Sequence, residues 1–405
     1  MGGARPGRRK DQEPVNGKHR QDGTHDDKVP AYDASVTEGA PPAGTGSHEV
    51  ERGRQELSGD GRTVLVTGAS GMLGEHVARL LAARHWTVRL LQRRHAPLAD
   101  QPNVEEVLGS VTDPDAVARA MEGVDDVVHL AAKVSFAGDW DEFVLTNVTG
   151  TRVVLETARR AGVDNVVFVS SPSVAHTGDS IVGEPARAAD PVHARGNYAR
   201  SKAAAELLAL EADGRGMRVT AVRPHIVWGP GDTQLVERIV DRAAKGRLPL
   251  LDHGAALIDT TYVDNAAEAV VRALERIEWA HGRALVVTNG QPRTVGELVA
   301  GFCRAAGVEP PTRRVPGVLA RLAGTVIEKV WAVRPGADEP PMTAFLAEQM
   351  STAHWFEQQS TREVLDWTPS VTVEEGMARL AEYYRTHPLG AHDAPMPATG
   401  STAAR

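Results

Sequence analysis

Between about residues 61 and 228, short apolar runs alternate with segments in which apolar residues recur every three or four positions. Short runs rich in valine and leucine are typical of buried strands, and the longer spacing is typical of amphipathic helices. Strands that alternate with helices predict an α/β fold with a doubly wound parallel sheet, whose binding sites lie at the carboxyl ends of the strands. The predicted strands are Thr63–Thr67, Thr87–Leu91, Val104–Leu108, Asp126–Leu130, Asn165–Ser170 and Arg218–Arg223, and the predicted helices are Leu73–Arg84, Asp113–Met121, Asn147–Ala161 and Tyr198–Glu211.

From residue 229 to about 386 the pattern loosens, which predicts a smaller C-terminal substrate-binding lobe whose chain returns in part to the core. Within this region, Val315–Val333 carries an apolar stripe at helical spacing. Arg321, Glu328 and Lys329 interrupt the stripe, so we do not expect it to span a membrane. We interpret it as a packed or lid helix, with an interfacial helix beside a lipid-like substrate as the alternative.

Both ends of the chain lack an apolar period. Residues 1–60 are rich in glycine, proline and charged side chains, and residues 387–405 are polar and punctuated by proline and glycine. Such segments cannot offset the entropy of ordering by burial, so both are predicted to be disordered tails. No apolar stretch follows the basic start Met1–Lys10, so a secretory signal is not supported and a cytoplasmic location is expected.

Composition narrows the classes of function. The chain has 405 residues, 24% of them charged, and a net charge of -8, so no overall basic field is present to attract nucleic acid. The length suits one large α/β core with an appended lobe. Cys303 is the single cysteine, which excludes a disulfide framework and a cysteine metal site, and no metal site is predicted.

The first predicted strand runs directly into a glycine-rich loop, Gly68–Gly74, and an amphipathic helix follows at once. Glycines allow the backbone to turn tightly and to approach a diphosphate, whose charge then lies against the free N–H groups of the helix N-terminus. A chance glycine turn is the alternative for the spacing alone, but the flanking strand and helix favour a dinucleotide site. The residues predicted to contact the cofactor here are Gly68, Ser70, Gly71, Met72, Leu73 and Gly74.

The second predicted strand ends at Gln92, Arg93 and Arg94 instead of at an acidic residue. An acidic side chain there would accept hydrogen bonds from the adenosine ribose, whereas arginines suit a 2′-phosphate. NADP(H) is therefore favoured as the cofactor. NAD(H) is the alternative, in which Arg93 and Arg94 are only solvated surface charges.

Candidate catalytic side chains follow the fifth predicted strand. Ser171 comes at the carboxyl end of that strand, and Tyr198 and Lys202 are four residues apart, so they share one face of a helix. The lysine would lower the pKa of the phenol by stabilising the phenolate. Ser171 would hydrogen-bond the substrate oxygen, and Tyr198 would act as base for alcohol oxidation or as acid for ketone reduction. For the spacing alone, an exposed helical pair is the alternative.

With these motifs, the chain resembles the extended short-chain dehydrogenases, and within them the 3β-hydroxysteroid dehydrogenase and sterol-4α-carboxylate 3-dehydrogenase group. The resemblance spans about Thr63–Arg385 and implies a Rossmann-type fold and an oxidoreductase activity. It also implies that Asn147 supports the active site and its proton relay, and that helix packing forms a homodimer. The same resemblance implies further cofactor contacts from Ser110, Val111, Leu130, Ala131, Ala132, Lys133, Pro224, Ile226 and Val227, besides Tyr198 and Lys202, and substrate contacts from Val134, Ser171, Ser173 and His225.

Some residues distinguish the branches of this family. The stretch Pro172–Gly178 is one residue longer than in the sugar-nucleotide epimerases, and a histidine after the proline, here His225 after Pro224, is a feature of the sterol-type branch. Ile258 stands before Asp259 where the sugar-nucleotide enzymes commonly have an arginine that holds the diphosphate. Without that cation, a buried diphosphate would be poorly compensated.

The remaining histidines carry weaker signals. We expect His129 to be structural and His176 and His253 to be surface residues. His225 approaches the substrate or, as the alternative, is held by backbone contacts. Ser110 departs from the family pattern, which often has an aspartate near the adenine at this position.

The combined prediction is an NAD(P)-dependent oxidoreductase that passes a hydride between nicotinamide and the alcohol or ketone of an apolar substrate. That substrate is steroid-like or is a β-hydroxy or β-keto acid. A sugar-nucleotide epimerase or dehydratase is one alternative, and a non-catalytic NADP-binding regulator is another. The candidates for an apolar substrate site, each equally compatible with the core, are Val134, Phe136, Trp140, Ile226 and Trp228.

Overall fold

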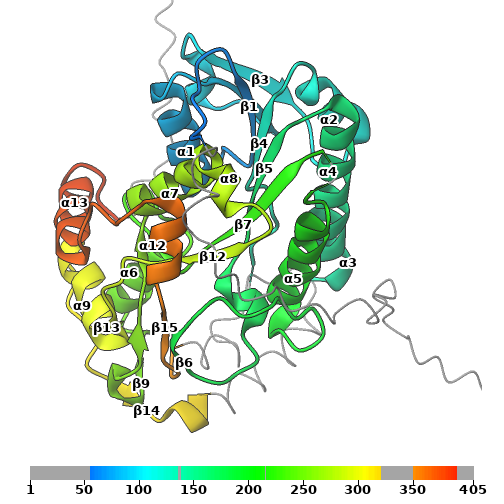
Figure 1. Ribbon diagram of the computed structural model, residues 1–405. Helices are drawn as coiled ribbons and strands as arrows, with labels where there is room; N and C mark the ends of the chain where they lie inside the picture. Colours follow the sequence, from blue (N-terminus) through cyan, green and yellow to red (C-terminus); the bar gives the residue numbers. More distant parts are fainter. Residues whose placement is uncertain (1–54, 136–137, 215, 321–349, 390–405) are drawn as a thin grey trace, which may run out of the picture. The chain divides into compact units, whose positions relative to one another are not determined.

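The computed structural model describes residues 55–135, 138–214, 216–320 and 350–389. Their central element is a seven-stranded sheet in the order β12-β7-β5-β4-β1-β2-β3, in which every neighbouring pair is parallel (Figure 1). Successive strands run outward from β1 to β3, and the chain then crosses back to place β4 on the other side of β1. Nucleotide sites form at such a switch point. The strands are β1 (Thr63–Thr67), β2 (Thr87–Gln92), β3 (Val104–Leu108), β4 (Asp126–His129), β5 (Asn165–Val169), β7 (Arg218–Pro224) and β12 (Ala284–Val287).

The predicted strands are all present, and the prediction of a doubly wound parallel sheet is confirmed. The strand that completes the sheet, β12, lies within the region assigned to the lobe. It pairs with β7 in parallel and places Val287 opposite Pro224. The chain after residue 229 therefore contributes a strand to the main sheet.

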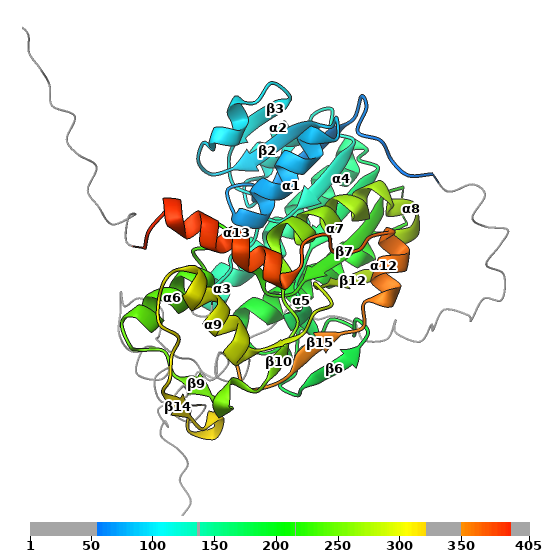
Figure 2. The ribbon, with the colours of Figure 1, turned by 90° about the vertical axis from the view of Figure 1, so that its left-hand side faces the viewer.

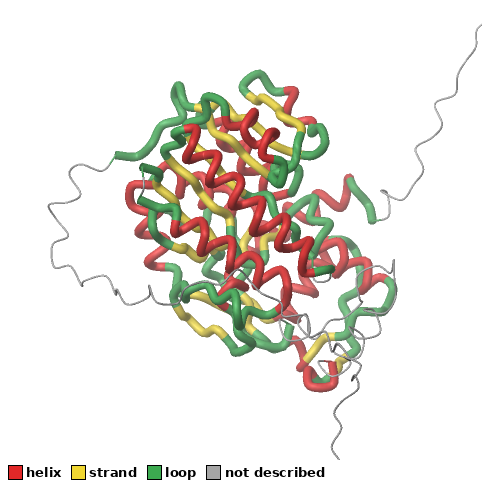
Figure 3. The backbone as a smooth tube through the Cα atoms, turned by 90° about the vertical axis from the view of Figure 1, so that its right-hand side faces the viewer, coloured by secondary structure: helices red, strands yellow, loops and turns green. Residues whose placement is uncertain are grey.

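Helices cover both faces of the sheet. The helices α1 and α7 pack against each other on one face (Figure 2), and α2, α4 and α5 cover the opposite face (Figure 3). Alternate side chains of β1 serve the two layers: Val64 and Val66 join the first apolar cluster, and Leu65 joins the second. These helices are α1 (Met72–Ala83), α2 (Pro114–Met121), α4 (Gly150–Ala161), α5 (Gly196–Glu211) and α7 (Val263–Glu275).

The smaller lobe has a core of its own around Trp228. The indole ring centre lies 5.4 Å from that of Tyr262 and 5.2 Å from that of Phe302. The indole N–H donates to Thr260 Oγ1 at 2.8 Å, so its one polar atom is satisfied. Trp228 thus belongs to the lobe core and does not line a substrate site.

Strands of the lobe come from distant parts of the chain. A four-stranded sheet in the order β13-β10-β15-β6 joins β6, which precedes α5, to β15, which lies near the C-terminus. The lobe elements are β6 (Ile181–Glu184), β8 (Val227–Trp228), α6 (Val236–Ala244), β9 (Leu250–Leu251), β10 (Leu257–Ile258), β11 (Thr261–Tyr262), β13 (Arg293–Thr294), α9 (Val295–Ala305), β14 (Arg314–Val315), β15 (His354–Phe356) and α13 (Val373–Thr386). The short helical turns are η3 (Pro97–Asp100), α3 (Trp140–Phe143), η4 (Val144–Thr149), η5 (Pro172–Ala175), η6 (Asp252–Gly254), α8 (Ile277–Ala280) and α12 (Gln359–Leu365).

The described chain is packed against the sheet domain before β1 begins. The Leu57 N–H donates to the Glu275 carbonyl at 2.7 Å, and the Glu56 carboxylate pairs with Arg272 at 3.0 Å and with Arg276 at 2.6 Å. Hydrogen bonds from these arginines lower the pKa of Glu56 to about 2. Residues 55–60, which we predicted to be part of a disordered tail, are thus packed, because docking through ion pairs needs no apolar period.

Some sequence predictions concern residues that the structure does not describe. Residues 1–54, 136–137 and 390–405 lie outside the described residues, as does most of the apolar stripe, from Arg321 onward. At the start of that stripe, Val318 and Leu319 are exposed and Ala320 is buried. None of the helices described here is long and apolar enough to cross a bilayer.

Candidate active site

The glycine loop lies between β1 and α1, at the switch point of the sheet. Gly68 has a φ of 79°, and a Cβ on it would lie 2.7 Å from the Ala131 backbone nitrogen, so a larger residue does not fit. A Cβ on Gly74 would overlap the Gly68 carbonyl, whereas the nearest atom to a Cβ on Gly71 would be 3.6 Å away. The loop is therefore tightly packed on its inner side and open at Gly71.

This loop fits the diphosphate of a dinucleotide. Gly71 begins α1 without a side-chain cap, so the N–H groups of the first turn stay available, and the positive end of the helix favours an anion. Ser70 and Gly71 are exposed at the opening, and Met72 and Leu73 beside them are half-buried. The predicted cofactor residues of this loop thus range from exposed, at Ser70 and Gly71, to buried, at Gly74.

Beyond β2 the chain presents two guanidinium groups. Arg93 and Arg94 are exposed, and neither has a hydrogen bond or an ion pair with another described residue. The Gln92 side chain is buried and donates to the Glu106 carboxylate, which also pairs with His95 Nδ1 at 2.8 Å. The Glu106 carboxylate is therefore engaged, while the two guanidinium groups are free for a ligand.

The segment Leu130–Lys133 leads from the glycine loop toward α5. Gly68 packs directly against its first residues. The Lys133 N–H donates to Asn147 Oδ1 at 2.7 Å, and Asn147 Nδ2 donates to Ser201 Oγ at 2.9 Å. Asn147 is buried in the π-helical turn η4. Its amide ties the chain after β4 to the helix that carries Tyr198, which suits the supporting role predicted for it.

Ser110 and Val111, which follow β3, differ in the burial of their side chains. Ser110 is half-buried, and its hydroxyl lies 2.8 Å from Thr112 Oγ1. Val111 is buried, and its side chain fills the space beside Gly150 at the start of α4. A cofactor contact from Val111 would therefore come from its backbone, since the side chain belongs to the core.

Ser171 and Tyr198 lie together beyond the carboxyl end of β5. Ser171 begins the turn η5, and its Oγ lies 2.9 Å from Ser173 Oγ. Tyr198 stands in the first turn of α5, and burial raises the pKa of its phenol to about 12. The Ser171 hydroxyl opposes that rise as a side-chain hydrogen-bond partner of the phenol. At neutral pH the phenol keeps its proton and can donate it.

Lys202 lies one helical turn beyond Tyr198, with only 2% of its surface exposed. Its Nζ donates to the Val169 carbonyl at 2.7 Å and lies 4.0 Å from the centre of the Phe168 ring. Both the carbonyl and the ring face favour a cation. Burial lowers the pKa of Lys202 to about 7, and the charge of Glu206 opposes that change. The charge of the lysine therefore depends closely on its neighbours.

The chain after β7 carries the remaining predicted cofactor contacts. Pro224 ends β7, Val227 begins β8, and Ile226 between them has a φ of 45°, a strained value for a β-branched residue. His225 is buried, and its Nδ1 lies 2.6 Å from the Asp259 carbonyl oxygen. That contact agrees with the alternative in which the backbone holds His225.

His225 belongs to a group of three buried histidines. The His354 ring centre lies 6.0 Å from that of His225 and 4.7 Å from that of His176, and the Nε2 atoms of His354 and His176 are 3.0 Å apart. The prediction that His176 is a surface residue is therefore wrong. No local signal could have shown this, because His354 lies far along the chain. His253 is exposed, as predicted.

His129 is structural, as expected from the sequence. It is buried, its Nδ1 lies 2.7 Å from Thr67 Oγ1, and its Nε2 lies 3.0 Å from Thr151 Oγ1. Burial lowers its pKa to about 3, with a smaller contribution from Lys202. The ring thus joins β1, β4 and α4 as a neutral group.

Apolar surface near the catalytic residues is limited. Val134 is 56% exposed, while Ile226 is half-buried. Trp140 is half-buried beneath Arg200, whose guanidinium carbon lies 4.7 Å from the indole centre. Among the described candidates for an apolar substrate contact, Val134 is therefore the most exposed, while the candidate Phe136 lies outside the described residues.

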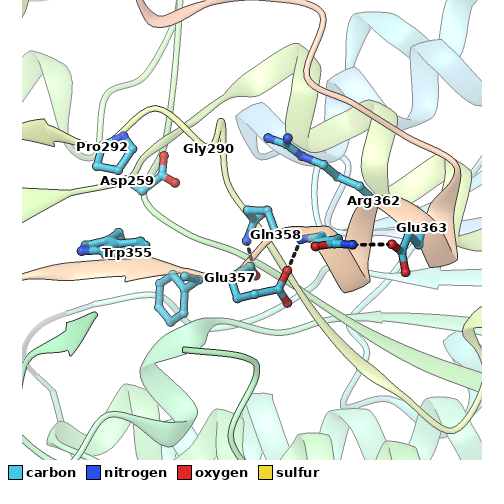
Figure 4. Close-up of a pocket in the computed structure, with 10 residues that line it drawn as sticks. Asp259, Gly290, Pro292, Trp355, Glu357, Gln358, Arg362 and Glu363 are labelled. Carbon is cyan, nitrogen blue, oxygen red and sulfur yellow. Dashed lines mark hydrogen bonds between the residues drawn. The ribbon is translucent and has the colours of Figure 1, made fainter. Parts of the chain in front are cut away.

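A separate pocket of about 540 Å³ lies beside β15 and α12 (Figure 4). Its lining includes Asp259, Trp355 and Arg362, and none of the residues predicted for the cofactor or the substrate. Thr288 Oγ1 and the Gln291 N–H donate to the Asp259 carboxylate, which keeps that acid satisfied. Nowhere in the described parts of the chain do histidine, cysteine and acidic side chains group in a way that could hold a metal ion.

The fold and the site together define a class of protein. A doubly wound sheet holds a glycine loop at its switch point, and beyond the carboxyl end of β5 a serine lies beside a tyrosine whose helix also carries a buried lysine. These features are typical of a dinucleotide-dependent oxidoreductase.

The chain belongs to the NAD dependent epimerase/dehydratase family, whose model matches residues 64–288, and is an NAD(P)-dependent oxidoreductase acting on CH–OH groups. The family resemblance seen in the motifs is thus confirmed. The chain is 36% identical to a 2-alkyl-3-oxoalkanoate reductase of Stenotrophomonas maltophilia, across 78% of this chain and 98% of the relative. It is 27% identical to a mouse sterol-4-alpha-carboxylate 3-dehydrogenase, decarboxylating, across 79% of this chain and 90% of the relative.

Solved structures agree with this assignment. The crystal structure of gox2253 is 26% identical in sequence, with a TM-score of 0.65 over 80% of this chain and 98% of that chain. MoeE5 in complex with UDP-glucose and NAD is 23% identical, with a TM-score of 0.63 over 81% of this chain and 99% of that chain. At that identity, the likeness to MoeE5 shows the fold alone.

The buried histidines predict a fold that weakens in acid. Burial lowers the pKa of His129 and of His354 to about 3 and that of His225 to about 4, whereas an unfolded histidine titrates near 6.5. The unfolded chain therefore binds more protons below that value, and stability falls as the pH drops. Each such histidine is expected to lower the free energy of unfolding by about 2 kcal/mol between pH 7 and pH 5.

Urea unfolding at pH 7 and at pH 5 measures this effect. The variant His354→Gln should show a smaller loss of stability between the two pH values than the unsubstituted chain. Equal losses in the two proteins would contradict the assignment of His354 as a buried neutral group.

Proposed function

We propose that the chain is an NADPH-dependent reductase of 3-oxo acids that carry an apolar alkyl group, a reaction of the 3β-hydroxysteroid dehydrogenase type. The observation that carries the proposal is the placement of Ser171, Tyr198 and buried Lys202 at the carboxyl end of β5. A hydroxyl and a phenol that lie together can both donate to one ketone oxygen.

The proposed roles follow from the protonation states of these groups. When bound, NADPH supplies the hydride that the ketone carbon accepts. Ser171 and Tyr198 donate hydrogen bonds to the ketone oxygen, which orients the carbonyl and draws electron density from its carbon. As negative charge grows on that oxygen, the Tyr198 proton moves to it. The Lys202 ammonium then stabilises the phenolate that remains.

Two observations support an apolar acid as the substrate rather than a sugar nucleotide. Ile258 occupies the position where sugar-nucleotide enzymes commonly carry an arginine, and Val134, which directly follows Lys133, exposes apolar surface. The curated relatives agree, since 2-alkyl-3-oxoalkanoate reductases of two bacteria are 36% and 34% identical to this chain. The sterol and hydroxysteroid dehydrogenases are 26–29% identical, so a steroid-like substrate is the second candidate.

Turnover of reduced nicotinamide by the full-length chain tests this proposal. With NADPH in excess, a 2-alkyl-3-oxoalkanoate is expected to be reduced with net NADPH consumption, and faster than a 3-ketosteroid. Tyr198→Phe should lower kcat by about 10²-fold or more, because it removes the proton donor. Tyr383→Phe on α13 is the matched control and should keep full turnover. Interconversion of UDP-sugars without net NADPH consumption would overturn the proposal in favour of an epimerase.

The two arginines after β2, Arg93 and Arg94, predict that the chain prefers NADPH to NADH. Each is exposed and free of a partner in the part of the chain that the structure describes, so each can bind a 2′-phosphate. The double variant Arg93→Gln/Arg94→Gln should raise KM for NADPH by about tenfold or more and leave KM for NADH nearly unchanged. Arg119→Gln, which neutralises an exposed arginine on α2, serves as the control. Equal KM changes for NADPH and NADH would contradict the proposed role of the arginines.

A further inference from the structure

A fully buried ion pair lies beneath the catalytic lysine. The Glu206 carboxylate and the Arg223 guanidinium are exposed by 0% and 1%. Arg223 Nε donates to Glu206 Oε2 at 2.8 Å, a second guanidinium nitrogen donates to Oε1, and the third donates to the Arg187 carbonyl at 2.7 Å. Both carboxylate oxygens and all nitrogens of the guanidinium fork are thus engaged.

The pair joins the two parts of the chain that flank the site. Glu206 follows Lys202 by one turn of α5, so the two side chains lie on the same face of that helix. Arg223 is the last but one residue of β7, directly before Pro224, where the predicted nicotinamide loop begins. The ion pair therefore connects the helix of Tyr198 and Lys202 to the strand that leads into the cofactor loop.

Stability alone does not explain this pair. Removing two charges from water costs several kcal/mol per ion, and well-packed apolar residues in place of a buried pair are often neutral or stabilising. A buried carboxylate can have another use where a nearby cation must keep its proton. Lys202 is such a cation, because its ammonium is buried and the Val169 carbonyl and the Phe168 ring are the contacts found for it among the described residues.

Charged and titratable groups near Lys202 come from α5, β4 and β7. Glu206 on α5 raises the pKa of Lys202 against the effect of burial. His129 on β4 is neutral because its own pKa is about 3, and the Tyr198 phenol on α5 is neutral because its pKa is about 12. Arg223 on β7 is a cation and is held against the carboxylate. Glu206 is therefore the group whose charge favours the protonated lysine.

We propose that Glu206 is a positioning residue of the reaction, which keeps the Lys202 ammonium charged beside Tyr198 while Arg223 fixes the carboxylate in place. This inference rests on the proposed function in one respect, namely that the charged lysine serves proton transfer. The bidentate grip of Arg223 prevents the carboxylate from turning away. The same grip transmits any displacement of α5 to the strand before the cofactor loop.

Two variants separate the charge of Glu206 from its structural role. The neutral pair Glu206→Gln/Arg223→Met removes both buried charges together, so neither partner is left unpaired. The exchanged pair Glu206→Arg/Arg223→Glu restores an ion pair but places the cation next to Lys202. Asp126→Asn is the matched control, because Asp126 is also a buried carboxylate paired with an arginine, Arg62, but lies at the amino end of β4.

The protonation of Lys202 is measured directly by NMR of the full chain labelled with ¹³C and ¹⁵N in lysine. The chain has seven lysines, and loss of one signal in Lys202→Met assigns the resonance. In the neutral pair, the midpoint of the Lys202 titration should fall by about one pH unit, and in the exchanged pair by more. Asp126→Asn should lower Tm and leave that midpoint unchanged.

The pH profile of ketone reduction gives the second readout. If Lys202 must be charged, the basic limb of kcat/KM should move to lower pH by the same amount as the NMR midpoint. A Lys202 midpoint that stays in place in the folded neutral pair would overturn the inference, and so would an unchanged basic limb beside a shifted midpoint. A shifted midpoint in a chain that reduces no 3-oxo acid would instead leave the charge control standing and refute the proposed function.

Discussion

A buried lysine one helical turn beyond a tyrosine is the feature on which the proposed site depends. Desolvation favours the neutral form of Lys202, so the surroundings must favour the cation. The Val169 carbonyl and the Phe168 ring do so from the end of β5, and Glu206 does so from α5. Each of these groups is placed by the parallel sheet or by the helix packed on it, so the charge of one side chain depends on the whole α/β arrangement.

The rest of the site is built around the same helix. Asn147 links α5 to the chain after β4, and that chain packs against Gly68 of the glycine loop. Arg223 links α5 to β7 and so to the loop that begins at Pro224. The parts expected to hold the two ends of a dinucleotide are therefore both joined to the helix that carries the proton donor. A displacement of α5 would therefore move both the glycine loop and the loop that begins at Pro224.

The features that could be predicted from the sequence are those encoded by local spacing. Six of the seven strands of the main sheet, the loop Gly68–Gly74 and the four-residue spacing of Tyr198 and Lys202 are each encoded within a short stretch, so periodicity and motif reveal them. The seventh strand, β12, lies in the region where the pattern loosens and was not predicted. The features that were missed join residues distant in the chain. His176 meets His354, Glu56 meets Arg272, and Glu206 meets Arg223. None of these pairs has a sequence signal, because only the fold brings its members together.

The substrate is harder to predict from the sequence than the other features of the site. Val134, Ser171 and Tyr198, which we propose to contact the substrate, come from three separate segments, so no single stretch of sequence carries the identity of the ligand. For this reason the motifs identify the type of reaction better than they identify the substrate.

If the serine, the tyrosine and the lysine support net hydride transfer to a ketone, the hydrogen from the cofactor must appear in the product. We would supply NADPH deuterated at both C4 positions and analyse the 3-hydroxy acid product by mass spectrometry and NMR. One deuterium is expected at the carbinol carbon for each NADPH consumed. Product that carries no deuterium at that carbon, or label that stays with the protein while NADPH is not consumed, would show that no such transfer takes place.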